Sequence, residues 1–164
     1  MGSPALLLAD DMGLGKTVQA IVAISRLHRR GEVDQALVVA PAGLLAQWRR
    51  MFREWAPELQ VAIIRGSAEE RPWQWRRRVQ VYLAGYETVR ADLSSHPGCT
   101  LRRIWDVVVL DEAQRIKNRD TVTAIACKRL PRRRAWALTG TPVENDIDDL
   151  ASICEFLAPW TEAN

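Results

Sequence analysis

The sequence predicts an α/β fold in which a parallel sheet carries helices on both faces. Short apolar runs rich in β-branched residues alternate along the 164 residues with stretches of helical periodicity. The apolar runs are continuous rather than alternating, which is typical of strands that are buried on both sides. The length suits one domain and is sufficient for a sizeable core.

The first half of the chain alternates strands and helices. The run ALLLA at 5–9 predicts a buried strand, and a helix follows over about 16–29. QALVVAP at 35–41 predicts the second strand. The next helix, 44–57, has its apolar side chains at helical spacing and is ended by Pro57.

The second half continues with four further strands. VAIIRG at 61–66 predicts the third, and VQVYLAGY at 79–86 predicts the fourth, followed by a short helix. WDVVVLDEA at 105–113 and RAWALTGTP at 134–142 predict the last two strands. A final helix is expected from about 146 to 157. Because ligands of such sheets bind outside the carboxyl ends of the strands, motifs at those ends are expected to form one site.

Charge and cysteine content restrict the class of protein. The net charge of +3 and the pI of about 9.0 permit nucleic-acid binding without establishing it. Most basic residues come in clusters, at 26–30, 75–78, 101–105 and 129–134, and solvated loops and helix ends are the favoured interpretation of each cluster. The three cysteines, Cys99, Cys127 and Cys154, are widely spaced and are expected to be reduced thiols in a cytosolic protein. The apolar run near the start is too short for a signal peptide or a membrane span.

Six tryptophans fall into two predicted groups. Trp48, Trp55, Trp105 and Trp136 lie on predicted core faces and are expected to pack there. Trp73 and Trp75 stand beside three arginines and are expected to form a partly exposed structural patch. The alternative for this pair is stacking on bases or on a partner.

The stretch after the first strand has the features of a phosphate-binding loop. Gly13 and Gly15 permit a tight turn that aims backbone N–H groups at phosphate oxygens, and the following helix adds its positive end. Lys16 would reach the β- and γ-phosphates, and the Thr17 hydroxyl would bind Mg²⁺. The alternative is a chance glycine-rich turn before a helix.

Two carboxylates end the fifth predicted strand. Asp111 and Glu112 would both face the cleft once the chain turns beyond the strand. Hydrolysis of a phosphoanhydride needs a metal ion held by a carboxylate and a group that orients the attacking water. We expect Asp111 to bind Mg²⁺, through water, and Glu112 to be the general base. Capping of the following helix is the alternative role for these residues.

The segment ALTGTP at 137–142 also ends a predicted strand. Its small hydroxyl residues and Gly140 suit a segment that responds to a bound nucleotide. An ordinary turn before a helix is the alternative.

Together these stretches resemble the first RecA-like, P-loop NTPase lobe of the Swi/Snf-type remodelling ATPases, helicase-like motors of superfamily two. The stretches that carry the resemblance are motif I (DDMGLGKT, 10–17), motif Ia (VVAPAGLLAQWRRMFREW, 38–55), motif Ib (GYETVRADL, 85–93), motif II (DEAQRIKN, 111–118) and motif III (LTGTPVEN, 138–145). The resemblance covers nearly the whole chain, and motifs I and II together are highly specific.

The resemblance implies a role for each motif. Motif I would bind ATP through Gly13, Leu14, Gly15, Lys16 and Thr17. Lys16, Asp111 and Glu112 would be catalytic, with Mg²⁺ bound by Thr17 and Asp111. Gln114 would contact the nucleotide and link it to the coupling residues Thr139, Gly140 and Thr141. The backbone of double-stranded DNA would be contacted by Pro41, Gly43, Leu44 and Tyr86, which implies salt-dependent and sequence-tolerant binding.

The chain departs from common patterns at three positions. Asp10 stands where a general phosphate loop has its first glycine, although this family usually has an acidic residue there. Gln114 stands where many members have His. Gly43 replaces the Ser that is common in motif Ia, which removes a hydroxyl that could hold a DNA phosphate.

The motifs of the second lobe do not occur in residues 1–164, so we expect a single lobe that is nearly inactive alone. A second RecA-like lobe, in cis or in trans, would supply the arginines of the active site. Expected partners are double-stranded DNA and other protein subunits, with no membrane. We expect a cytoplasmic protein, nucleoid-associated in a bacterium or nuclear in a eukaryote. Two alternatives stay open: a non-catalytic nucleic-acid or partner-binding module derived from such a motor, and the motor lobe of a restriction or defence complex.

Overall fold

The computed structural model describes residues 4–9, 13–95, 98, 103–140 and 147–161. Their strands form one six-stranded sheet in the order β1-β6-β5-β2-β4-β3. All neighbouring strands are parallel. The strands are β1 (Ala5–Ala9), β2 (Ala36–Ala40), β3 (Val61–Ile63), β4 (Val81–Gly85), β5 (Val107–Leu110) and β6 (Ala135–Thr139). The predicted α/β fold with a parallel sheet is confirmed.

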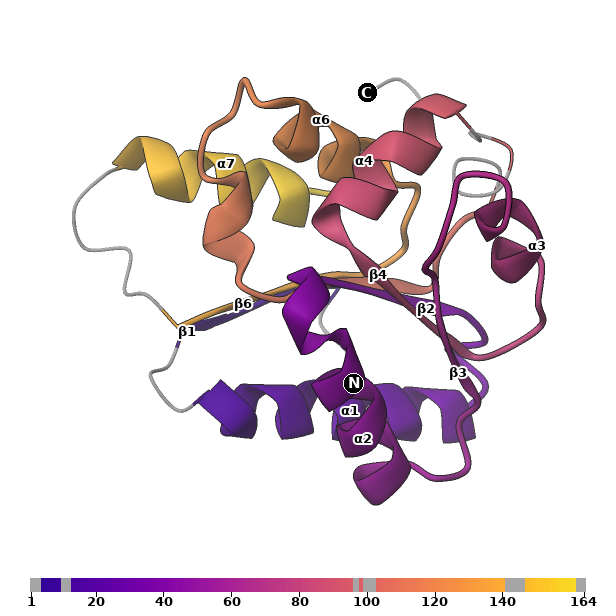
Figure 1. The fold of residues 1–164 in the computed structure, drawn as a ribbon. Coiled ribbons are helices and arrows are strands. Elements are labelled where there is room, and N and C mark those ends of the chain that lie inside the picture. Colours follow the sequence, from indigo (N-terminus) through magenta and orange to yellow (C-terminus); the bar gives the residue numbers. More distant parts are fainter. Residues whose placement is uncertain (1–3, 10–12, 96–97, 99–102, 141–146, 162–164) are drawn as a thin grey trace.

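Helices cover both faces of this sheet (Figure 1). The α-helices are α1 (Gly13–Arg29), α2 (Leu45–Trp55), α3 (Arg71–Trp75), α4 (Tyr86–Ser95), α6 (Val122–Arg129) and α7 (Ile147–Leu157). Two short 3₁₀ helices, η1 (Ala42–Leu44) and η2 (Ala113–Ile116), follow β2 and β5. Helices α1 and α2 lie on one face, and α4, α6 and α7 lie on the other.

Helix α6 was not expected from the sequence. Its buried residues are small, as Ala124 and Cys127 illustrate, so its apolar periodicity is weak. A capping contact marks its start instead, because the Thr121 hydroxyl accepts a hydrogen bond from the Ala124 N–H at 3.1 Å.

Successive residues of the central strands enter two separate cores. On β5, Val109 packs in the core between the sheet and helices α1 and α2, together with Ile21 and Phe52. Its neighbour Val108 packs in the opposite core, together with Phe156 of α7. This burial on both faces explains why the strands are continuously apolar in sequence.

The parallel arrangement places the carboxyl ends of all strands at one edge of the sheet. Four helices begin there: α1 follows β1, η1 follows β2, α4 follows β4 and η2 follows β5. The turns that carry the predicted motifs therefore lie at a common edge, which is the arrangement that a shared site requires.

The tryptophans correct two predictions. Trp48, Trp105 and Trp136 are buried as expected. Trp55, expected in the core, is 49% exposed because α2 ends there and Ala56 enters the core instead. Trp75 was expected in a partly exposed patch and is fully buried.

Trp73 is 57% exposed, which agrees with a partly exposed patch. Cys127 and Cys154 are free thiols, and Cys99 lies outside the described residues. None of the helices in the described residues is long and apolar enough to span a membrane.

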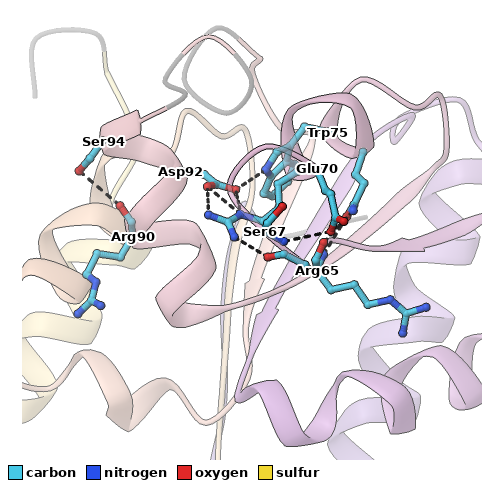
Figure 2. Close-up of polar contacts among 10 residues, drawn as sticks. Arg65, Ser67, Glu70, Trp75, Arg90, Asp92 and Ser94 are labelled. Atoms are coloured by element: carbon cyan, nitrogen blue, oxygen red, sulfur yellow. Dashed lines mark hydrogen bonds and ion pairs between the residues drawn. The ribbon is translucent and has the colours of Figure 1, made fainter.

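A buried carboxylate explains why Trp75 is inside. Asp92 of α4 is fully buried and accepts hydrogen bonds from Arg71 Nε at 2.9 Å and from Trp75 Nε1 at 2.8 Å (Figure 2). A second guanidinium nitrogen of Arg71 lies 2.9 Å from the same carboxylate. The Trp75 ring stacks on Tyr82 with 6.1 Å between centroids. Asp92 therefore holds α3 against α4. The apolar periodicity of the sequence does not predict α3.

Loss of the Asp92 charge is expected to destabilise the fold. Asp92→Asn keeps the side-chain size but leaves the Arg71 guanidinium, only 13% exposed, without its counter-charge. We expect the free energy of unfolding in urea to fall by about 3 kcal/mol, as for a buried ion pair that loses one partner.

Glu87→Gln is the matched control, because Glu87 pairs with Arg115 at 3.8 Å on the surface. It should change the same free energy by less than about 0.5 kcal/mol. Equal and small effects of the two substitutions would show that Asp92 does not anchor α3.

Candidate active site

The first turn of α1 supplies a buried lysine and a buried threonine. Lys16 and Thr17 are both more than nine-tenths buried. Lysine side chains are seldom buried to this extent unless they are paired. A Cβ atom at Gly140 would lie 3.6 Å from Lys16 Nζ, so the ammonium lies beside the carboxyl end of β6. Motif I and motif III are thus brought together as the sequence predicts.

Asp111 follows β5 and is held at both carboxylate oxygens. Oδ2 accepts a hydrogen bond from Trp48 Nε1 at 2.8 Å, and Oδ1 accepts one from the Glu112 N–H at 2.9 Å. Burial raises the pKa of Asp111, while these two hydrogen bonds and the charge of Lys16 act in the opposite direction. The charge of Glu112 also raises this pKa.

The main chain of Asp111 is fixed as well. Its N–H donates to the Val39 carbonyl at 2.8 Å, and its carbonyl accepts from the Tyr86 hydroxyl at 2.5 Å. Burial raises the pKa of Tyr86 well above its usual value, so the phenol remains a donor at neutral pH.

Tyr86 is one of the residues that the sequence predicts to contact DNA. Tyr86 is only 1% exposed, and its hydroxyl is directed to Asp111. In this structure it supports the Asp111 turn, and its contact with DNA stays a prediction. Motif Ib resembles the family pattern at this position, but the pattern alone does not show whether the ring is exposed.

Glu112 adopts a left-handed backbone conformation with φ 53° and ψ 52°. Within the described residues, no other residue except glycine has a positive φ. Such a conformation costs on the order of 1–3 kcal/mol and tends to occur at functional sites. It ends the strand abruptly, and the next residues form η2.

Gln114 of η2 joins Glu112 to motif III. Its Nε2 donates to Glu112 Oε2 at 3.1 Å, and its Oε1 accepts from the Thr139 hydroxyl at 2.8 Å. The expected link between Gln114 and Thr139 is present. Thr141, the other expected coupling residue, lies outside the described residues.

The remaining predicted DNA contacts lie at the carboxyl end of β2. Pro41 precedes η1, which contains Gly43 and Leu44. Gly43 is exposed, and a Cβ atom there would have nothing within 4 Å. Its backbone is therefore open to a ligand from solvent.

The donor set suits Mg²⁺ with a nucleotide. The described residues contain no cluster of three or more His, Cys, Asp or Glu side chains that could form a metal cage. Mg²⁺ bound to nucleotides needs only one or two protein oxygens, with phosphates and water completing its shell. Asp111 and the Thr17 hydroxyl are oxygen donors of this kind, and the start of the 17-residue α1 suits a phosphate.

The contact of Trp48 with Asp111 was missed at the level of sequence. The helical spacing of α2 correctly places this residue in the core, but periodicity does not reveal a hydrogen bond made by its indole. The signal available was its position in motif Ia, one helical turn after Leu44.

Comparisons of sequence identify the family of this chain. The model of the family described as "SNF2-related domain" matches residues 1–162. Human "DNA excision repair protein ERCC-6-like" is 34% identical over 157 residues, covering 92% of this chain and 12% of that protein. The "ISWI chromatin-remodeling complex ATPase ISW1" of Saccharomyces cerevisiae is 32% identical over 160 residues, covering 93% of this chain and 14% of the relative.

Solved structures agree as well. The Sulfolobus solfataricus SWI2/SNF2 ATPase core in complex with dsDNA has a TM-score of 0.81 and 36% identity, over 94% of this chain and 31% of that one. The Sulfolobus solfataricus SWI2/SNF2 ATPase core domain has a TM-score of 0.78 and 35% identity, over 94% of this chain and 31% of that one. The fold is therefore that of one RecA-like lobe of such a core.

The chain thus spans only a small part of these relatives, but nearly all of it matches them. With a family model over almost every residue and relatives above 30% identity, this chain belongs to the SNF2-related domain family.

Proposed function

We propose that this chain is the ATP-binding N-terminal motor lobe of a DNA-dependent ATPase that couples ATP hydrolysis to movement along double-stranded DNA. The observation that carries the proposal is the connected site at one edge of the sheet. Lys16 lies beside the end of β6, and Glu112, Gln114 and Thr139 form one hydrogen-bonded series next to Asp111.

The residues of this site suit separate tasks in phosphoanhydride hydrolysis. Lys16 would bind the β- and γ-phosphates, and the first turn of α1 would donate N–H groups to them. Bound Mg²⁺ would neutralise charge on these phosphates. Thr17 and Asp111 would hold that ion, Asp111 through water. Glu112 would orient the attacking water and accept its proton.

The series from Glu112 to Thr139 would couple the two ends of the site. Gln114 contacts the proposed base on one side and motif III on the other. A change in the position of Glu112 on hydrolysis would therefore reach β6 through two hydrogen bonds. Gly140 beside Lys16 would bring the same segment next to the phosphates.

DNA would bind at the carboxyl end of β2. The exposed backbone at Gly43 supports this location. The similar ATPase core in complex with dsDNA supports double-stranded DNA as the ligand, without bearing on where it binds. Backbone N–H groups and arginines hold phosphates without distinguishing bases, so binding would fall as salt rises. A second RecA-like lobe would supply the arginines that stabilise the transferring phosphoryl group, and the chain alone would be nearly inactive.

Two other functions share part of this site. A non-catalytic binding module would need none of Lys16, Thr17, Asp111 and Glu112, yet all four are kept. The motor lobe of a restriction or defence complex would use the same chemistry with different partners. A non-catalytic module would not hydrolyse ATP. The motor lobe of a restriction or defence complex would hydrolyse it and would differ from the proposed motor only in its partners.

Nucleotide binding by the chain alone is expected to depend on Lys16. Lys16→Ala should weaken the affinity for a fluorescent ATP analogue about 10- to 100-fold, since hydrogen bonds to charged groups are worth about 1.5–3 kcal/mol. Fluorescence anisotropy with Mg²⁺ present measures this affinity. Glu112→Gln should leave it within about twofold, because Glu112 acts on water rather than on phosphate.

Circular dichroism is the control for the folding of both variants. Equal binding by the Lys16→Ala variant and the unaltered chain would contradict a nucleotide site at the start of α1.

Hydrolysis is expected to need DNA and a second lobe. The chain alone should show little ATPase activity, and the chain joined to a second RecA-like lobe should be stimulated by double-stranded DNA. Because the arginines of the second lobe are worth about 10³–10⁵ in rate, a steady-state phosphate-release assay resolves the difference. Glu112→Gln in the two-lobed protein is the matched control and should abolish turnover. A two-lobed protein that binds ATP and never hydrolyses it would support the non-catalytic module.

A further inference from the structure

Trp48 makes a contact in the candidate site that its packing does not require. The ring lies in the core between the sheet and helices α1 and α2, with its centroid 6.1 Å from that of the Phe52 ring. Its Nε1 nevertheless reaches out of this core and donates to Asp111 Oδ2 at 2.8 Å. The side chain thus belongs to both the core and the site.

Two of the other buried tryptophans show that burial alone does not give an indole N–H a partner in this fold, whereas Trp75 donates to Asp92. Trp105 and Trp136 are both buried, and the Nε1 atom of each lacks a hydrogen-bond partner. Trp136 even packs in the same core as Trp48. The contact of Trp48 with a carboxylate is therefore a specific feature of its position.

This contact limits the orientation of the carboxylate. An ionised carboxylate has about four acceptor positions on its two oxygens. In Asp111 one oxygen accepts from the Glu112 N–H and the other from Trp48, so rotation of the group would break at least one of these bonds. The acceptor positions that remain are fixed in direction, as a metal ion with strict octahedral geometry requires.

Trp48 is itself held by the segment proposed to bind DNA. It lies in the first turn of α2, which continues directly from η1. Leu44 is the last residue of η1 and stands four positions before Trp48, so the two lie on the same side of this helical segment. A continuous helical segment and one hydrogen bond therefore connect the exposed backbone at Gly43 to the Asp111 carboxylate.

We infer that Trp48 is a positioning residue, whose indole N–H orients the Asp111 carboxylate for Mg²⁺ with bound nucleotide. The inference rests on the proposed function and adds to it a residue outside the phosphate loop and motif II. It predicts that Trp48 affects the part of nucleotide affinity that depends on Mg²⁺, and not the part that remains without the metal.

The test is a Mg²⁺ titration of nucleotide binding. Anisotropy of a fluorescently labelled ADP is measured in EDTA and at increasing Mg²⁺, with direct excitation of the label so that loss of a tryptophan does not alter the signal. In the Trp48→Phe variant, the Mg²⁺ concentration that gives half of the effect should rise about 10-fold, as for other groups that orient a metal ligand. Affinity in EDTA should stay within about twofold.

Trp136→Phe is the matched control. It makes the same substitution in the same core but removes an N–H that has no partner, so its Mg²⁺ midpoint should equal that of the unaltered chain. Asp111→Asn should raise the Mg²⁺ midpoint at least as much as Trp48→Phe does, because it removes the charge that Trp48 is proposed to orient. If Trp48→Phe does not fold, replacing Trp48 by β-(3-benzothienyl)alanine keeps the bicyclic ring and removes only the N–H, and the same 10-fold rise is expected.

Three results would overturn the inference, and they differ from one another. Equal Mg²⁺ midpoints for Trp48→Phe and Trp136→Phe would show that the hydrogen bond does not orient the carboxylate. An equal loss of affinity in EDTA and in Mg²⁺ would show that Trp48 acts through packing. Failure of the unaltered chain to bind labelled ADP under either condition would contradict the proposed function itself.

Discussion

Four hydrogen bonds fix Asp111 where β5 ends, and the geometry of the candidate site depends on them. The main chain is held by Val39 of β2 and by the hydroxyl of Tyr86, and the carboxylate is held by Trp48 and by the N–H of Glu112. These contacts tie β5 to β2, α2 and the start of α4. Because buried polar groups are costly unless paired, each contact also constrains the element that supplies it. One residue thus connects three of the predicted motifs.

The left-handed backbone at Glu112 is the second constraint. Two adjacent residues in an extended strand would point to opposite faces of the sheet, and the turn changes that geometry. Asp111 is directed toward the α2 side, while Glu112 contacts Gln114 of η2. The strain of about 1–3 kcal/mol is offset by the hydrogen bonds around it. The two carboxylates can therefore have different partners and, in the proposed function, different roles.

The sequence predicts most of the fold and the composition of the site, because continuous apolar strands, glycine-rich turns and strand-end carboxylates each have a local signal. Long-range contacts have no such signal. Trp75 is buried because Asp92, 17 residues later, accepts its N–H, and Trp55 is exposed because α2 ends at that residue. Tyr86 and Trp48 both donate to Asp111, more than 20 residues away in sequence. Motif spacing predicts that these residues are near the site, but only the structure shows that they support its carboxylate.

The central claim is that Mg²⁺ and a nucleotide bind at the carboxyl edge of the sheet, between α1 and Asp111. A crystal structure of the chain with a non-hydrolysable ATP analogue and Mn²⁺ tests it most directly, since anomalous scattering identifies the metal. The account predicts phosphates against the first turn of α1 beside Lys16, and Mn²⁺ between Thr17 and Asp111, with the bond from Trp48 to Asp111 retained. A nucleotide bound elsewhere, or a metal ion remote from Asp111, would contradict it.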